Sequence, residues 1–118
     1  MKVEIDGNKL EYKVVVGKSG ERHVVITRGA EVRGDLAIPA KIDECPVTII
    51  GDSAFSCCGG LTGVSIPNSV TYIRASAFWG CSGLKCVILP NSVNKIGAWA
   101  FMGCSGLTRM EIPDGVMV

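Results

Sequence analysis

The feature that most constrains this chain is a repeat with a period of 23 residues. Residues 66–88 and 89–111 are identical at 13 of 23 aligned positions, and a looser copy of the same apolar pattern lies upstream. Self-similarity at a fixed period in the twenties indicates a solenoid, in which each repeat stacks on the next and buries a continuous core. The repeat therefore sets the architecture of the chain.

Each repeat divides into the same local elements. Gly63 to Ile66 alternates with the period of a strand, and Pro67 ends it because proline lacks the N–H that a ladder requires. After an Asn-Ser turn, residues 70–73 predict a second short strand, and residues 75–80 predict one turn of helix that stops at a glycine. Eight positions of the middle repeat are expected in the core: Val70, Ile73, Ala77, Phe78, Cys81, Leu84, Val87 and Leu89.

The chain divides into two regions of different pattern. Residues 1–35 lack the repeat and contain short β-rich runs, which predicts a β-hairpin-like cap over the first turn of the solenoid. Residues 36–118 carry the repeats, with a loop insertion at 40–46 and a last repeat that begins at Val116 and stops. Two interpretations of this end stay open. Either the chain is a fragment of a longer array, or its open end packs against a partner or a second copy.

Charge and hydropathy exclude several classes of protein. Twelve basic and eleven acidic residues give a net charge of +1, so no strong field favours nucleic acid or anionic lipid. The N-terminus lacks the apolar segment of a signal peptide, and no run reaches the roughly 18 apolar residues that would span a bilayer. We expect no membrane insertion, although a chain that begins inside a longer protein would look the same.

The segments IPNSVTYIRASAFWGCSGL and PNSVNKIGAWAFMGCSGLTRMEIP closely resemble the BspA-type leucine-rich repeat, whose pattern is IPxSVTxIGxxAFxGCxxLxxVxIP. The resemblance covers about residues 36–118, with departures at Arg74, at Asn94 and in the insertion. It implies an α/β, β-rich solenoid, a right-handed leucine-rich repeat superhelix of about three turns with an N-terminal β cap. It also implies a bacterial cell-surface or secreted protein that acts in adhesion, with no catalytic residues and no cofactor.

Six cysteines raise the question of metal or disulfide chemistry. Cys58, Cys81 and Cys104 recur at the repeat spacing, so stacking places them in a row about 4.8 Å apart. The outer two are then roughly 10 Å apart, about twice the separation that one shared zinc allows, and parallel side chains do not form disulfides. We expect no metal and buried free thiols. The more reactive cysteines are expected at non-core positions: Cys45, Cys57 and Cys86.

The tripeptide Gly51-Asp52-Ser53 superficially resembles the nucleophile block of GDS-type esterases. The aligned residues of the later repeats are unrelated to it, and the single histidine, His23, falls in the cap region. A serine nucleophile requires a base within hydrogen-bond reach. We therefore predict that the protein is not an enzyme, that Asp52 or Ser53 caps the helical turn, and that His23 is exposed on a strand.

Solenoids usually bind along the exposed face of their stacked strands. In this sequence that face is small and apolar in its middle and charged at its ends, which suits a protein or peptide better than a polyanion. The candidate binding residues on the strand face are Ser65, Cys86, Ile88, Arg109 and Glu111.

Trp79 and Trp99 are expected on the same side of the helical turns of adjacent repeats. With Met102 they form an exposed aromatic patch for a sugar ring or an apolar protein surface, unless they merely cover neighbouring backbone.

Arg33, Gly34 and Asp35 spell an integrin-recognition tripeptide where a turn is expected between the cap and the first repeat. Gly-Asp is also ordinary turn chemistry, so a purely structural role is the alternative.

The predicted function is a non-catalytic protein-binding or adhesion module that binds a protein, such as a host or matrix protein, through its strand face. A glycan is the second choice of ligand. The alternative is a structural spacer, a stretch of solenoid that holds other parts of a longer chain apart and has no ligand of its own.

Overall fold

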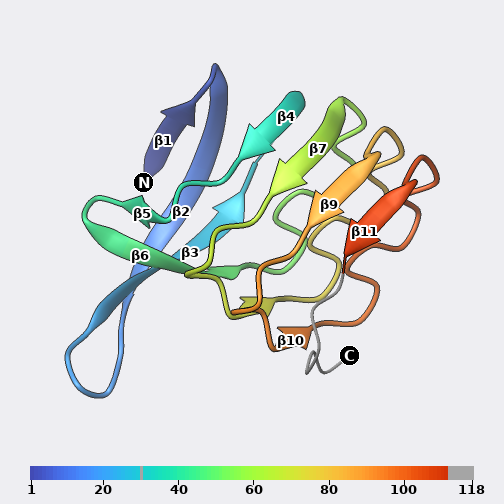
Figure 1. The fold of residues 1–118 in the computed structure, drawn as a ribbon. Coiled ribbons are helices and arrows are strands. Elements are labelled where there is room, and N and C mark those ends of the chain that lie inside the picture. Colours follow the sequence, from blue (N-terminus) through green and yellow to red (C-terminus); the bar gives the residue numbers. More distant parts are fainter. Residues whose placement is uncertain (30, 112–118) are drawn as a thin grey trace.

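Two sheets run along the stack of repeats (Figure 1). The computed structural model describes residues 1–29 and 31–111, which form a β-solenoid of about four turns. Each turn contributes one strand to a parallel sheet with the order β11-β9-β7-β4. These strands are β4 (Gly34–Ala37), β7 (Leu61–Ser65), β9 (Cys86–Ile88) and β11 (Arg109–Glu111).

The second sheet joins the N-terminal region to the solenoid. β1 (Lys2–Ile5), β2 (Asn8–Val16) and β3 (Arg22–Arg28) form an antiparallel meander. β3 then pairs in parallel with β6 of the solenoid, and the order continues through two short strands. The solenoid strands of this sheet are β6 (Cys45–Ile50), β8 (Tyr72–Ile73) and β10 (Lys95–Ile96).

The three strands of the N-terminal meander match the predicted β-rich runs. Val24 and Ile26 of β3 and Leu10 of β2 are fully buried in the common core, so the meander covers the apolar end of the first turn. The division into a cap at 1–35 and repeats at 36–118 stays an interpretation, because the second sheet is continuous across the boundary.

The insertion at 40–46 forms a small hairpin rather than an irregular loop. β5 (Lys41–Ile42) pairs antiparallel with the start of β6, and the turn residues Asp43 and Glu44 have φ values of 54° and 63°. Beyond the hairpin, β6 still pairs in register with β8. The insertion therefore leaves the stacking of the repeats intact, as predicted.

All eight predicted core positions of the middle repeat are buried, which confirms how the repeat was divided. Along the stack, Phe55, Phe78 and Phe101 form a column with ring centroids 5.2 and 5.3 Å apart and nearly parallel planes. Phe78 has a ring on each side and is fully buried, whereas Phe101 is half-buried. Each ring therefore fills the apolar space between two turns of the solenoid.

The three aligned cysteines link successive turns, a role that the sequence did not predict. The Sγ atoms of Cys58, Cys81 and Cys104 donate to main-chain carbonyl oxygens of the preceding segment at 3.1, 2.9 and 3.2 Å. Burial raises the pKa of the Cys104 thiol, so this thiol keeps the proton that it donates. The accepting carbonyls belong to Gly29, Phe55 and Phe78.

The predicted helical turn at residues 75–80 is wrong, because residues 1–29 and 31–111 contain no helix. In its place the chain makes tight turns in which Ser53, Ser76 and Trp99 have left-handed φ values of 54°, 58° and 58°. The physical reason is that alternate N–H groups of residues 76–80 bond to carbonyls of the next turn, at 2.7 to 3.0 Å. Those groups are then not available for the i→i−4 bonds of a helix.

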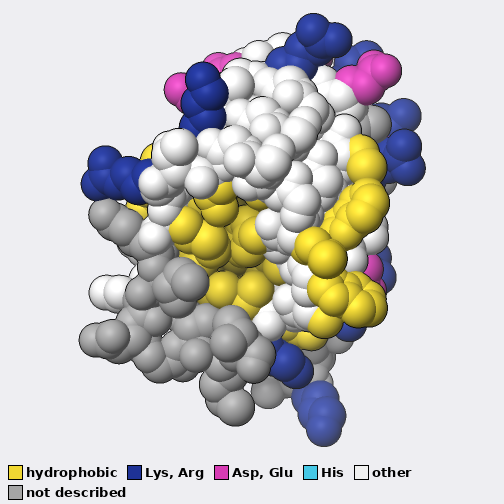
Figure 2. Space-filling view, turned by 90° about the vertical axis from the view of Figure 1, so that its right-hand side faces the viewer, with side chains coloured by type: hydrophobic (Ala, Val, Ile, Leu, Met, Phe, Trp, Pro, Cys, Tyr) yellow, Lys and Arg dark blue, Asp and Glu magenta, His cyan; other side chains and the backbone are white. Residues whose placement is uncertain are grey.

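Figure 2 looks at the β11 end of the stack and shows hydrophobic side chains inside the last described turn. Phe101, Leu107 and Met110 pack against the core there and are half-buried. The predicted start of a further repeat at Val116, and the chain end on which the prediction of self-association depends, lie outside the described residues.

The phenyl column predicts the energetic effect of a mutation. Phe78→Ala should lower the free energy of unfolding by about 3–5 kcal/mol, because it opens a cavity between two other rings. Phe101→Ala serves as the matched control and should cost clearly less, since Phe101 is half-buried and stacks on one described ring. Urea unfolding followed by circular dichroism measures both values, and equal losses would contradict this role of the column.

Candidate functional site

Two rows of residues, aligned by the strand register, run across the strands of the parallel sheet. Strand register aligns the first row, Asp35, Gly63, Cys86 and Arg109. The second row consists of Ala37, Ser65, Ile88 and Glu111. The residues between the rows on β4, β7 and β9 are buried, as the alternation along a strand requires. The predicted strand-face residues are therefore neighbours in one sheet.

A hollow of about 220 Å³ opens on this face, lined from β4, β7 and β9. Gly63 lets the Asp35 carboxylate lie over the β7 backbone, because a Cβ at this position would stand 2.7 Å from Asp35 Oδ1. Ile88 contributes an apolar side chain that is 45% exposed, and Cys86 beside it is half-buried. The hollow thus combines small residues from one strand with an exposed apolar side chain from the next.

The two edges of the sheet carry charged residues. Asp35 lies on the edge strand β4, and its carboxylate accepts a hydrogen bond from Thr62 Oγ1 at 3.0 Å, which fixes it beside the hollow. Arg109 is exposed on β11 at the opposite edge, where Glu111 pairs with Ile88 in the strand register. The hollow is therefore acidic on its β4 side.

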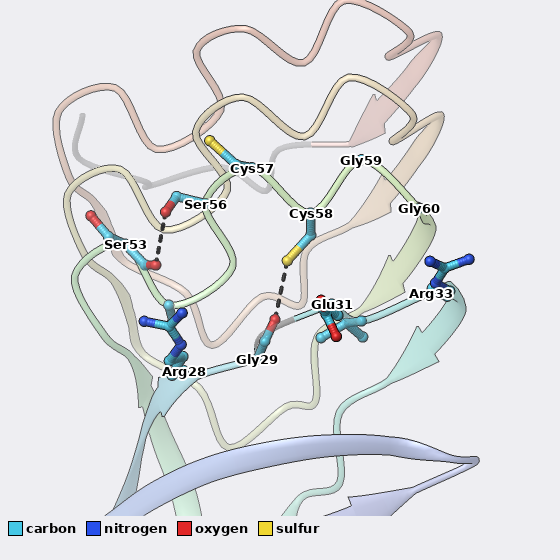
Figure 3. Close-up of a pocket in the computed structure, with 12 residues that line it drawn as sticks. Arg28, Gly29, Glu31, Arg33, Ser53, Ser56, Cys57, Cys58, Gly59 and Gly60 are labelled. Carbon is cyan, nitrogen blue, oxygen red and sulfur yellow. Dashed lines mark hydrogen bonds between the residues drawn. The ribbon is translucent and has the colours of Figure 1, made fainter.

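A larger cavity of about 370 Å³ lies between residues 28–29 and 31–33 on one side and the turn at 53–60 on the other (Figure 3). Sequence reasoning missed this cavity. The cavity exists because the N-terminal region contains no copy of the Ala-Phe turn that would stack on residues 53–60. The absence of this copy from the sequence is the signal that could have revealed the cavity. Arg28, Glu31 and Arg33 are the charged residues among those that line it.

Two side chains of the larger cavity are bonded to the main chain. Ser56 Oγ donates to the carbonyl of Ser53 at 3.2 Å, and Cys58 Sγ donates to the carbonyl of Gly29 at 3.1 Å (Figure 3). The protons of this hydroxyl and this thiol are therefore engaged in hydrogen bonds within the protein.

His23 does not lie exposed on its strand as predicted. It belongs to β3 but is half-buried, and its Nδ1 lies 2.6 Å from Thr48 Oγ1 on the neighbouring strand. The residues that line the cavity around Ser53 do not include it. Asp52, predicted as a possible helix cap, instead lies 3.9 Å from Arg74 on the surface. The described residues therefore do not bring Ser53 to a histidine base.

The tripeptide Arg33-Gly34-Asp35 does not form the predicted turn, because Gly34 and Asp35 already belong to β4. Asn8 holds its start in place, donating through Nδ2 to Arg33 O and accepting at Oδ1 from the Arg33 N–H, both at 3.0 Å. Gly34 has a φ of 73°, which glycine adopts without strain. The tripeptide is therefore part of an ordered edge strand.

The predicted aromatic patch is exposed. Trp79, Trp99 and Met102 are 44%, 67% and 56% exposed, and we call these three residues the turn patch. Figure 2 shows exposed hydrophobic side chains gathered in a ridge along one side of the view. Exposure of this size argues against the alternative that the two indoles serve to cover neighbouring backbone.

All six cysteines are free thiols. Cys58 and Cys81 are buried, Cys57 is exposed, and the remaining three are half-buried. Within the described part of the chain, no group of three or more His, Cys, Asp or Glu side chains could hold a metal ion. The same residues form no helix that is long and apolar enough to cross a membrane.

The stacked 23-residue turns, with their parallel sheet and phenyl column, define a leucine-rich repeat solenoid. The family model described as the BspA type leucine rich repeat region (6 copies) matches residues 43–118, and the chain belongs to this family. The match confirms the resemblance inferred from the repeats. No curated protein matches the sequence significantly.

Solved structures share the fold. A leucine-rich repeat protein of T. pallidum has a TM-score of 0.80 and 29% identity over 90% of this chain and 49% of its own. One from Bacteroides capillosus has a TM-score of 0.78 and 32% identity over 98% and 84%. A leucine rich cell surface protein of Faecalibacterium prausnitzii has a TM-score of 0.72 and 29% identity over 99% and 38%. The chain thus spans less than half the length of two of these proteins.

The exposure of the thiols predicts the order of their alkylation. Under native conditions iodoacetamide should modify Cys57 first and leave Cys58 and Cys81 unmodified, because their sulfurs are buried and bonded to carbonyls. Peptide mass spectrometry after a time course reads this order, and the protein unfolded in urea should take up six labels. Early labelling of Cys81 in the native protein would contradict the packing described above.

Proposed function

We propose that this chain is a non-catalytic recognition module that binds a protein through the exposed face of its parallel sheet. The observation that carries the proposal is the hollow beside Ile88. The aligned positions of the two preceding strands hold Ala37 and Ser65, so the backbone of the repeat does not require a large apolar side chain there. A half-exposed isoleucine next to a hollow gains stabilisation when a partner covers it.

The chemistry of the hollow indicates the kind of protein segment that would fit. About 220 Å³ accommodates a single apolar side chain of the partner, placed against Ile88 and beside Ser65. The Asp35 carboxylate on the β4 side favours a basic group at that end of the segment. The expected ligand is therefore a segment in which an apolar residue lies close to a lysine or arginine.

Adhesion at a bacterial cell surface is the setting that we propose for this binding. Membership of the BspA-type family supports it, as does the likeness to the F. prausnitzii protein described as a leucine rich cell surface protein. Ser65, Cys86, Ile88 and Asp35 are the proposed contact residues, with Arg109 and Glu111 at the far edge of the sheet.

Surface plasmon resonance on a panel of immobilised matrix proteins tests the proposal. The wild-type protein should bind at least one member saturably, and Ser65→Arg, which fills the hollow, should abolish the signal. Asn94→Arg is the matched control, because it adds the same side chain at an exposed position beside β10 in the other sheet. Absence of binding by a folded protein, or equal loss in both variants, would favour the spacer.

The same binding assay measures the contribution of one side chain. Ile88→Ser should weaken binding by about tenfold or more, because full burial of an isoleucine contributes about 1.5–3 kcal/mol and 1.4 kcal/mol corresponds to a factor of ten. The melting temperature should stay unchanged, since Ile88 lies outside the core. A parallel fall in melting temperature would instead assign Ile88 a structural role.

A further inference from the structure

The tight turns that replace the predicted helices present a second surface, apart from the strand face. Two of the surface positions in each turn are stacked in columns by the bonds between successive turns. Ser53, Ser76 and Trp99 form the first column. Ser56, Trp79 and Met102 form the second column. The two columns form one surface. The turn patch is the C-terminal part of this surface, and the three serines are its N-terminal part.

The three side chains of the turn patch lie next to one another. Trp79 and Met102 occupy the same position in adjacent turns, and the neighbouring column of phenyl rings gives the spacing of those turns as 5.3 Å. Within the last described turn, the Met102 N–H donates to Trp99 O at 3.2 Å, which closes a β-turn and brings residues 99 and 102 together. The two indoles therefore lie diagonally across one continuous patch.

The backbone at Trp99 indicates that this side chain is not there for folding. Its φ of 58° is the left-handed value that Ser53 and Ser76 adopt in the preceding turns. A bulky residue is disfavoured in this conformation, and an indole that is 67% exposed recovers little through burial. Within the described residues, neither the turn nor the core accounts for Trp99, which favours contact with a molecule outside the chain.

The size and charge of the patch restrict what that molecule is. From their exposed fractions, the two indoles offer on the order of 300 Å² of surface, whereas a standard protein interface takes roughly 800 Å² from each partner. None of the six residues in the two columns is charged, and the neighbouring Asp52 and Arg74 lie as an ion pair at 3.9 Å, so neither a polyanion nor a charged peptide is favoured. A small, neutral ligand with a flat apolar face fits these limits.

We propose that the turn patch binds a neutral polysaccharide. A pyranose ring presents a face of C–H groups that stacks on an indole, and its edge carries hydroxyls that bond to serine hydroxyls. Successive sugar rings would lie over Trp99 and Trp79 and continue toward Ser76 and Ser56 along the stack. This site is separate from the strand face and does not depend on the function proposed for it.

The chain provides its own probe for this site, because Trp79 and Trp99 are its only two tryptophans. Their fluorescence should change saturably when cellohexaose, maltohexaose or mannohexaose is added. In native gels that contain hydroxyethyl cellulose, soluble starch or mannan, the protein should be retarded by at least one of these polysaccharides. Failure of all six probes to produce either signal would overturn the proposal.

The repeat supplies the variants for the test. Trp99→Ser and Trp79→Ser restore the residue found at the same position of an earlier turn, Ser76 and Ser56, so both variants should fold. Each should weaken polysaccharide binding more than tenfold, and Trp99→Ser should not lower the melting temperature. Ile88→Ser, on the strand face, should bind polysaccharide like the wild type, which separates this proposal from the one for the strand face.

Two further results would contradict a polysaccharide site. Retention that is unchanged in both tryptophan variants would place the sugar elsewhere on the protein. A dimer in sedimentation velocity that disappears in Trp99→Ser would assign the patch to a second copy of the chain.

Discussion

Hydrogen bonds between the main chains of successive turns are the interaction on which the rest of this structure depends. They connect each repeat to the next in fixed register, so that after the insertion at 40–46 each position stands over the same position 23 residues away. An apolar residue that recurs at this spacing becomes a column rather than an isolated contact, as Phe55, Phe78 and Phe101 show. The same register aligns the exposed residues of the strand face and those of the turn patch.

The parts of the fold that sequence could predict are those that the register repeats. Val87 and Leu89 could be placed in the core because strand alternation and the 23-residue spacing agree on them, and both are buried. The insertion at 40–46 could be recognised because the pattern resumes after it. The strand-face residues could be predicted in the same way, because the residues before and after a buried strand residue point to the opposite face of the sheet.

The features that the sequence could not predict depend on contacts between turns, and the sequence of a single repeat does not reveal these contacts. Residues 75–80 have a composition that suits a helical turn, but their N–H groups bond across the stack, and tertiary context overrides local propensity. The thiol of Cys81 finds its acceptor on Phe55, a carbonyl whose position only the stacked structure gives. The cavity beside residues 53–60 results from a repeat that is absent above it.

In a repeat protein, each column places different side chains at the same backbone position. Comparing them shows which side chains folding requires and which it only tolerates. Ser76 and Trp99 share a φ of 58°, so the turn forms with serine and does not itself require the indole of Trp99. Ser65 and Ile88 are aligned on the strand face, and the same reasoning applies to the exposed isoleucine. The inner columns hold phenylalanine and cysteine without change, whereas these outer columns vary, and that contrast is the physical ground for placing recognition on the outer columns.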